Sequence, residues 1–166
     1  MIDVLLKKPF PLFLTVLLFG LFSAPLYAQT AAELEELLGI QTVNYGQAAR
    51  FALEAADAAN PKSAEQAFKF AAEKRWLPQK AAAGDAARLD GVSLLLMQAF
   101  GVKGGMWYSL TKNPHYAYRE LVYLDVIQGR SDPNMTVSGE QLLFLINRLL
   151  SRQESAAVAA AGKGQS

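Results

Sequence analysis

The sequence predicts an all-α protein built from helix-loop-helix repeats. Three observations predict this fold class: apolar residues recur with helical spacing through most of the chain, capping signals precede these segments, and one stretch repeats at a constant offset. No segment shows the alternation of apolar and polar residues that is typical of a half-buried strand. We therefore expect helices joined by loops and no sheet.

The sequence pattern at the start of one predicted helix occurs a second time in the chain. Residues 42–53 read TVNYGQAARFAL, and residues 136–150 read TVSGEQLLFLINRLL. In each stretch a cap residue, Asn44 or Ser138, is followed three positions later by a glutamine. This spacing predicts a capping box, in which the cap accepts a hydrogen bond from the third helical N–H and the glutamine reaches back.

A longer repeat links the middle of the chain to its last third. Residues 67–100 align with residues 117–150 without a gap, at a constant offset of 50 residues. In this register Leu94-Leu95-Leu96 corresponds to Phe144-Leu145-Ile146. A constant offset indicates one supersecondary unit used more than once. The alternative is chance similarity between two amphipathic helices.

The repeat predicts three units, two clear and one compressed. The compressed unit covers residues 31–58, in which Gly39-Ile40 stand where the last unit has Val126-Ile127 and the loop is almost deleted. The two clear units cover residues 63–101 and 113–152.

Local signals predict where the helices of the clear units begin and end. Ser63 is the expected cap of one helix, which Pro78 should stop. Asn113 is the expected cap of another, with Pro114 at its first helical position. Gly and Asp-Pro within residues 129–134 predict a turn after this second helix.

The two ends of the chain differ from the repeats. Residues 1–28 have two lysines before a long apolar run that ends in small residues, the layout of a secretory signal peptide cleaved after Ala28. This predicts export to the periplasm or cell envelope; the alternative is an uncleaved membrane anchor. Residues 29–152 form one repeat domain, and residues 153–166, rich in Ala, Gly, Ser and Gln, should be a frayed helix end and a disordered tail.

Composition argues against several function classes. The 166 residues carry a formal net charge of +1, and after removal of residues 1–28 the charges balance, so no basic excess predicts nucleic-acid binding. The chain has no cysteine and one histidine, His115, which disfavours a catalytic zinc site or thiol chemistry. No nucleophile-elbow pattern accompanies a serine. We expect a protein without enzymatic activity or cofactor.

Two segments resemble a known family. Residues 88–105, RLDGVSLLLMQAFGVKGG, and residues 117–140, AYRELVYLDVIQGRSDPNMTVSGE, are similar to the S-layer homology motif, in divergent form as in exported envelope proteins of two-membrane bacteria. The resemblance covers residues 31–152. It implies repeats packed as a pseudo-threefold bundle, and a module that attaches to a wall glycan or peptidoglycan through grooves between repeats.

The resemblance also implies which residues bind. Family members use a loop motif, Thr-Arg-Ala-Glu, at the start of each second helix. Here Ser138 stands at the threonine position, but Gly139 replaces the arginine and Gln141 replaces the glutamate. In the middle unit, Arg88 and Asp90 match the arginine and the acid of the family motif if one residue is inserted in the alignment.

The loop at residues 101–118 adds aromatic and cationic side chains close together in the sequence. Aromatic faces beside cations suit a sugar or an anionic glycan. The alternative is that these aromatic residues fill a gap between repeats. The candidate ligand-binding residues are Arg88, Asp90, Lys103, Trp107, Tyr108, His115, Arg119 and Ser138.

A second function class stays open. A periplasmic protein-interaction or assembly subunit would use the same inter-repeat grooves for a partner polypeptide. A glycan site should show aromatic residues and arginine converging on a polar groove, whereas a protein site should show a contiguous apolar patch.

Overall fold

The computed structural model describes residues 24–129 and 131–163, and the chain divides into two compact units, residues 1–37 and 38–166. The described residues of the first unit belong to helix α2 (Ala24–Gly39), which continues across the division. The predicted signal peptide lies outside the described residues except for its last five, which begin α2.

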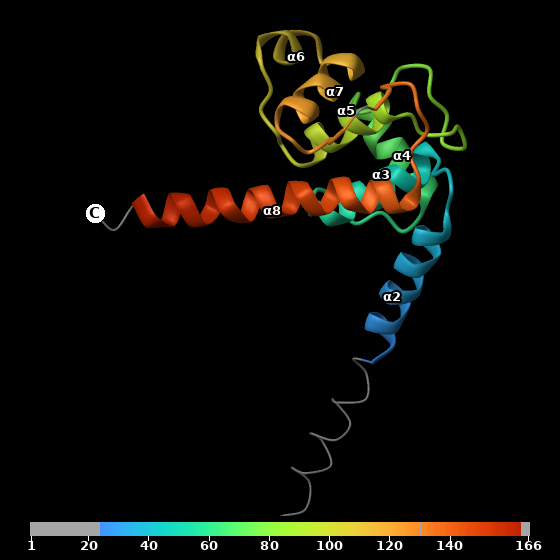
Figure 1. The fold of residues 1–166 in the computed structure, drawn as a ribbon. Coiled ribbons are helices and arrows are strands. Elements are labelled where there is room, and N and C mark those ends of the chain that lie inside the picture. Colours follow the sequence, from blue (N-terminus) through green and yellow to red (C-terminus); the bar gives the residue numbers. More distant parts are fainter. Residues whose placement is uncertain (1–23, 130, 164–166) are drawn as a thin grey trace, which may run out of the picture. The chain divides into compact units, whose positions relative to one another are not determined.

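The second unit holds the remaining described helices (Figure 1). No strand occurs among the described residues, which contain only two isolated β-bridges, Asn44 to Ala86 and Arg88 to Thr136. The predicted all-α fold class is confirmed. The helices are α3 (Tyr45–Ala55), α4 (Ala64–Glu73), α5 (Leu89–Ala99), α6 (Met106–Thr111), α7 (Pro114–Tyr123) and α8 (Gly139–Lys163).

Helices of neighbouring predicted repeats pack in pairs. Helix α3 packs against α4, and α5 packs against α7, so the second helix of one predicted repeat contacts the first helix of the next. Figure 1 shows α8 passing beside α3, which it contacts near its own start. Leu53, Leu95, Leu121 and Leu142 are fully buried in this packing.

Three backbone hydrogen bonds close a ring at the centre of the second unit. Val43 N–H donates to the Val137 carbonyl (2.9 Å), Val137 N–H donates to the Ala87 carbonyl (3.0 Å), and Ala87 N–H donates to the Val43 carbonyl (2.8 Å). All three residues have no exposed surface. The predicted repeat register places the same three residues at one position of the motif. Each strand-like segment before a second helix therefore bonds to both of the others.

The predicted helix starts agree with the structure. Asn44 accepts from Gln47 N–H (2.8 Å) while the Gln47 side chain accepts from Asn44 N–H (3.0 Å), so the capping box is complete. Ser63, Asn113 and Ser138 also accept backbone hydrogen bonds from the first turns of α4, α7 and α8. These contacts are local, which explains why the sequence alone predicts them.

The predicted end of α4 needs correction. The helix stops at Glu73 instead of continuing to Pro78. Arg75 has φ 58°, in the left-handed region, and Trp76 N–H donates back to the Ala71 carbonyl (2.8 Å). This bond satisfies a carbonyl at the helix end, so a backbone reversal terminates α4 before the proline can.

The same helix ending recurs fifty residues later. Asp125 has φ 59°, and Val126 N–H donates to the Leu121 carbonyl (2.9 Å) at the end of α7. The two aligned segments therefore share their backbone turn as well as their helices.

Two further segments are more helical than expected. Residues 153–163, expected to be a frayed helix end and a disordered tail, continue α8 with their side chains exposed as far as residue 162. Alanine is the strongest helix former, and this segment extends a helix already nucleated by buried residues. Residues 106–111, expected to lie in a loop, form the short helix α6, since Tyr108 is buried and anchors one face of it.

Candidate functional site

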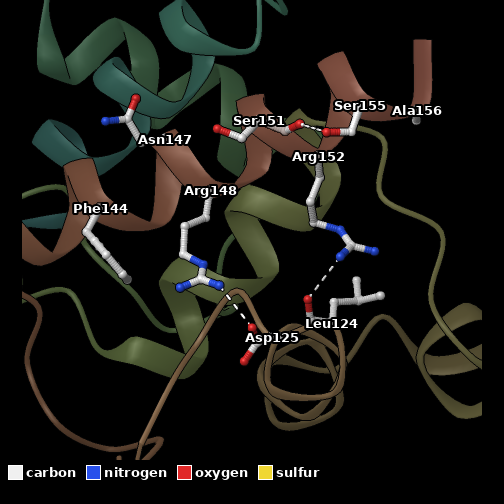
Figure 2. Close-up of a pocket in the computed structure, with 9 residues that line it drawn as sticks. All are labelled: Leu124, Asp125, Phe144, Asn147, Arg148, Ser151, Arg152, Ser155 and Ala156. Carbon is white, nitrogen blue, oxygen red and sulfur yellow. Dashed lines mark hydrogen bonds and ion pairs between the residues drawn. The ribbon is translucent and has the colours of Figure 1, made fainter. Parts of the chain in front are cut away.

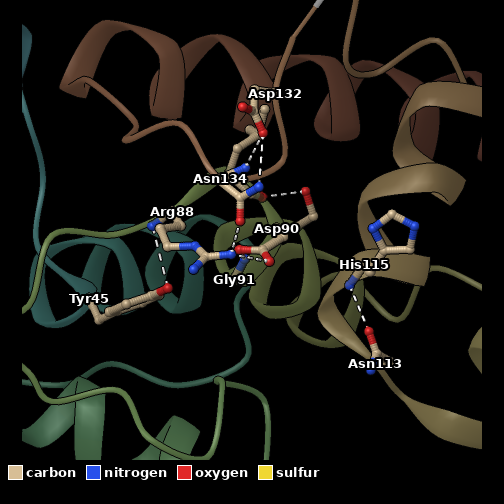
Figure 3. Close-up of polar contacts among 10 residues, drawn as sticks. Tyr45, Arg88, Asp90, Gly91, Asn113, His115, Asp132 and Asn134 are labelled. Carbon is tan, nitrogen blue, oxygen red and sulfur yellow. Dashed lines mark hydrogen bonds and ion pairs between the residues drawn. The ribbon is translucent and has the colours of Figure 1, made fainter.

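Arg88 lies where all three predicted repeats meet. It precedes α5 in extended conformation (φ −90°, ψ 152°) and makes no side-chain cap. Figure 3 shows its guanidinium group donating to the Asp90 carboxylate (2.9 Å) and to the side-chain carbonyl of Asn134. Its backbone N–H donates to the Tyr45 hydroxyl oxygen (3.3 Å). Arg88 thus contacts one residue 43 positions before it, Tyr45, and one residue 46 positions after it, Asn134.

Asn134 is held in place for this contact. Asp132 accepts from both the backbone N–H (2.8 Å) and the side-chain amide of Asn134 (3.1 Å). The amide then donates to Asp132 and its carbonyl faces Arg88 (Figure 3). Both hydrogen bonds that the Arg88 side chain makes with described residues use Nη2, and 47% of the side chain is exposed. Toward the described part of the chain, the other guanidinium N–H groups therefore stay available to a ligand.

Tyr45 forms one wall of the site. Burial raises the pKa of Tyr45 above the ordinary tyrosine value, and the hydrogen bond from Arg88 N–H opposes that rise. The neutral hydroxyl therefore acts as a fixed polar group beside the arginine.

A cavity of about 320 Å³ opens beside Arg88. Its polar lining is mixed in charge, with Lys80 and Arg88 facing Asp85 and Asp90. Such a lining offers donors to acidic groups and acceptors to hydroxyl groups. Its other lining residues are Tyr45, Pro78, Ala81, Ala86 and Pro114.

A larger groove of about 810 Å³ shares part of its lining with this cavity. Three residues, Pro78, Lys80 and Pro114, line both. The groove runs between the end of α4 and the segment that joins α6 to α7. Four cations line it, and no acidic side chain is among its described lining residues. The cations are Lys74, Arg75, Lys80 and Lys112.

Local packing positions the cations of this basic groove. The Lys74 ammonium lies 5.0 Å from the Phe70 ring centroid and 5.6 Å from that of Trp76. The Lys112 ammonium lies 4.5 Å from the Tyr108 ring centroid. Cation–π contacts of this kind restrain a lysine and leave its charge intact.

Backbone conformation places two of these cations at helix ends. Arg75 (φ 58°) follows α4, and Lys112 (φ 48°) caps the end of α6, both in the left-handed region. This conformation is the turn that ends each helix, and Asp125 adopts it after α7 as well.

Sequence reasoning missed the basic groove. The segment at residues 74–83 contains three cations and no acid, which was a usable signal. Its convergence with Lys112 depends on the packing of α7 against α5, which no local pattern specifies.

The predicted binding residues of the loop lie on an exposed surface. Lys103, Trp107, His115 and Arg119 are exposed and are absent from the lining of the cavity beside Arg88. Trp107 stacks on Tyr116 with ring centroids 6.4 Å apart and planes inclined at 21°. The structure therefore separates this aromatic group from the cavity beside Arg88 and Asp90.

Two other predicted binding residues, Tyr108 and Ser138, form hydrogen bonds within the protein. Tyr108 has 1% of its surface exposed, and its hydroxyl accepts from the Gln98 side chain (3.0 Å), so its ring offers no face for stacking. Ser138 accepts the N–H of Gln141 (3.1 Å) as the cap of α8. Each of these side chains therefore has a hydrogen-bond partner inside the protein.

A third groove, of about 920 Å³, lies along α8 (Figure 2). Here the cations have partners: Arg148 pairs with Asp125 (3.0 Å) and stacks over Phe144, and Arg152 donates to the Leu124 carbonyl (3.1 Å). Phe144 is 48% exposed, although Leu94, its equivalent in the predicted register, is 2% exposed. This groove therefore presents an aromatic side chain instead of free cations.

No family model, curated protein or solved structure matches this chain. Within the described residues, no group of three or more His, Cys, Asp or Glu side chains is arranged to hold a metal ion. Among the described helices, none is both long and apolar enough to cross a membrane.

Proposed function

We propose that this protein is a non-catalytic module of the cell envelope that binds an acidic wall glycan or peptidoglycan. The basic groove is the binding surface, and the cavity at Arg88 extends it. The predicted signal peptide delivers the chain to the periplasm or envelope, where such polymers are found.

One observation carries the proposal: four cations line a single groove without a described carboxylate among them. The whole chain has a formal net charge of only +1, so this is a local concentration of charge. A groove lined by one sign of charge attracts ligands of the opposite sign. The carboxylate or phosphate groups of an acidic glycan meet this requirement.

The chemistry beside Arg88 suits the sugar ring of such a polymer. Asp85 and Asp90 supply acceptors for hydroxyl groups, and the free N–H groups of Arg88 supply donors for an acidic substituent. Because Pro78, Lys80 and Pro114 line both cavities, the cavities adjoin, and in this proposal one extended chain of sugars occupies both.

The resemblance to S-layer homology repeats supports the same assignment. We include in the proposal that the three units pack as a pseudo-threefold bundle. The ring that joins Val43, Ala87 and Val137 is the arrangement expected for such a bundle, because each residue bonds to its two counterparts in turn.

Co-sedimentation with isolated sacculi tests the proposal. We expect a Lys74→Gln, Lys112→Gln double variant to bind about tenfold more weakly, since two cations leave the groove. The matched control is Lys62→Gln, Lys69→Gln, which removes the same charge from exposed positions outside the groove. Equal binding by the two double variants would refute the groove as the binding surface.

A defined polymer gives a second readout. Polygalacturonic acid carries a carboxylate on each sugar, and its fully methyl-esterified form has the same backbone without the charge. We expect binding to the acid form only, and weaker binding when salt is raised from about 0.05 M to about 0.5 M. Equal binding to both forms would show that charge does not select the ligand.

A partner polypeptide is the second candidate, favoured by the exposed Phe144 in the groove along α8. A photocrosslinking residue introduced at position 144 tests this in cells. A single discrete protein adduct, with no sacculus binding by the parent chain, would favour this function over glycan attachment.

A further inference from the structure

Helix α6 carries an exposed apolar surface that the basic groove does not use. Met106, Trp107 and Leu110 are 74%, 59% and 76% exposed on a helix of six residues. They occupy positions i, i+1 and i+4, so one side of the helix is apolar. We call these three residues the α6 tip. In Figure 1, α6 lies at the edge of the second unit, outside α7.

The tip is supported by a rigid base. Tyr108 points inward and is 1% exposed. The Gly105 N–H donates to the Glu120 carboxylate (2.8 Å). A Cβ added at Gly104 would lie 2.4 Å from the Tyr108 ring, so the glycine permits this close packing. Tyr108 therefore occupies the inner side of α6, and the three apolar side chains lie on its exposed side.

The two side-chain hydroxyl groups of α6 donate to carbonyls of the helix and its base. Ser109 Oγ donates to the Gly104 carbonyl (3.1 Å), and Thr111 Oγ1 donates to the Trp107 carbonyl (2.7 Å). Burying unpaired polar groups in an apolar medium costs free energy, whereas paired groups avoid most of that cost. The tip is therefore suited to entering a poorly hydrated environment.

The charged residues of the segment that carries the tip have one sign. Residues 101–119 contain Lys103, Lys112, Arg119 and His115 and no acidic residue. The next acid in the chain, Glu120, accepts the Gly105 N–H at the base. Tryptophan prefers the boundary between headgroups and acyl chains, and nearby lysine and arginine bind anionic headgroups.

We propose that the α6 tip docks on the surface of a bilayer containing anionic lipid, with Met106, Trp107 and Leu110 at the boundary between headgroups and acyl chains. Lys103 and Arg119 bind the headgroup phosphates. A sugar ligand fits less well, because Ser109 and Thr111, the two hydroxyl side chains of α6, already donate within the protein. Three side chains on six residues are also too few for a stable protein interface, which buries about 800 Å² on each partner.

The fluorescence of Trp107 tests this in the full chain. The protein has two tryptophans, so Trp76→Phe leaves Trp107 as the only reporter. We expect its emission to shift to the blue with phosphatidylcholine–phosphatidylglycerol vesicles, and to be quenched when the acyl chains are brominated. Leu110→Glu should weaken vesicle binding by about tenfold or more. Val158→Glu, at a 74% exposed position on α8, is the matched control and should bind as the parent does.

Two comparisons give the test its specificity. Lys103→Gln with Arg119→Gln should weaken binding to anionic vesicles and leave pure phosphatidylcholine vesicles unaffected. These residues are absent from the lining of the basic groove, so failure here is distinguishable from failure of glycan binding. If Trp76→Phe does not fold, Trp107→Phe in the otherwise unchanged chain should remove most of the quenching.

Several results would overturn the proposal. Vesicle binding without quenching of Trp107 would assign membrane contact to another segment, such as the apolar N-terminus. Absence of vesicle binding would exclude a lipid surface. Protection of Trp107 by polygalacturonic acid alone would assign the tip to a glycan, and loss of self-association in Leu110→Glu would assign it to a second copy of the chain.

Discussion

Gly91 lies so close to Tyr45 that a Cβ added at Gly91 would be 2.4 Å from the tyrosine hydroxyl and 2.8 Å from Cε1. This contact brings α5 of the middle repeat against the first residue of α3. It also positions the Tyr45 hydroxyl to accept the hydrogen bond from Arg88 N–H.

We expect Gly91→Ala to lower the free energy of unfolding by about 1–3 kcal/mol, because the added methyl group overpacks this contact. The higher helix propensity of alanine offsets part of that cost. Urea denaturation measures the change. Gly84→Ala is the control, since a Cβ at Gly84 meets nothing within 4 Å, and it should stay within about 0.5 kcal/mol of the parent. Equal stability of the two variants would contradict the close packing.

The central ring predicts a pattern of amide hydrogen exchange. The N–H groups of Val43, Ala87 and Val137 lie outside the helices, are fully buried and are hydrogen bonded to one another. Their exchange should require opening of the whole unit, and they should be among the slowest non-helical amides. The Ala81 N–H, bonded to Pro78 within a local turn, should exchange much faster. Similar rates for Ala81 and the ring would show that the ring opens locally.

Leu145 tests the repeat register. It is 2% exposed, as expected for the counterpart of the fully buried Leu95. Leu145→Ala should cost roughly 2–5 kcal/mol through lost burial and a residual cavity. Val158→Ala, at a 74% exposed position on the same helix, should cost less than about 0.5 kcal/mol. An unchanged denaturation midpoint for Leu145→Ala would refute a core position.

Tyr108 predicts a loss of stability at alkaline pH. Burial raises the pKa of Tyr108 from 10.0 to about 12. Between these values the unfolded chain releases the phenolic proton while the folded chain keeps it, so stability falls as pH rises through this window. The difference amounts to up to about 3 kcal/mol, because each pKa unit corresponds to about 1.4 kcal/mol. Below pH 10.0 the contribution is fully present.

Thermal unfolding measured across this pH window checks the sign and size of the effect. Tyr108→Phe should flatten the decline, although it also removes the hydrogen bond with Gln98. Tyr123→Phe should leave the decline unchanged, because Tyr123 is 86% exposed. A decline of equal slope in all three proteins would assign the effect to other groups.

Arg88 should matter more for binding than for stability. Its side chain is 47% exposed, and exposed ion pairs contribute about 0–1 kcal/mol. Arg88→Ala should therefore weaken sacculus binding while the melting temperature changes little. Arg88→Lys should recover only part of the binding, since lysine lacks the planar set of donors. Full binding by Arg88→Ala would remove this residue from the proposed site.

Local signals accounted for most of the helices. Caps such as Asn44 bond to residues three positions away, and apolar spacing placed Leu145 in the core, so the sequence within a few residues contained the information. Helix α6 was missed because its residues fill less than two turns, and Tyr108 becomes its anchor only when the rest of the fold surrounds it.

The candidate site was predictable only in part. Arg88 and Asp90 were identified from the motif, and the structure joins them by an ion pair. Their third partner, Asn134, lies 46 residues from Arg88, so no local pattern indicated it.

The sequence by itself determined the all-α class and the capped helix starts, because these depend on propensities and hydrogen bonds that span three or four residues. Tertiary structure alone decided which side chains share a surface. It closed the ring of Val43, Ala87 and Val137 and brought Lys74 and Lys112 to one groove. Such contacts depend on how whole helices pack, and packing is set by the summed burial of residues far apart in the chain.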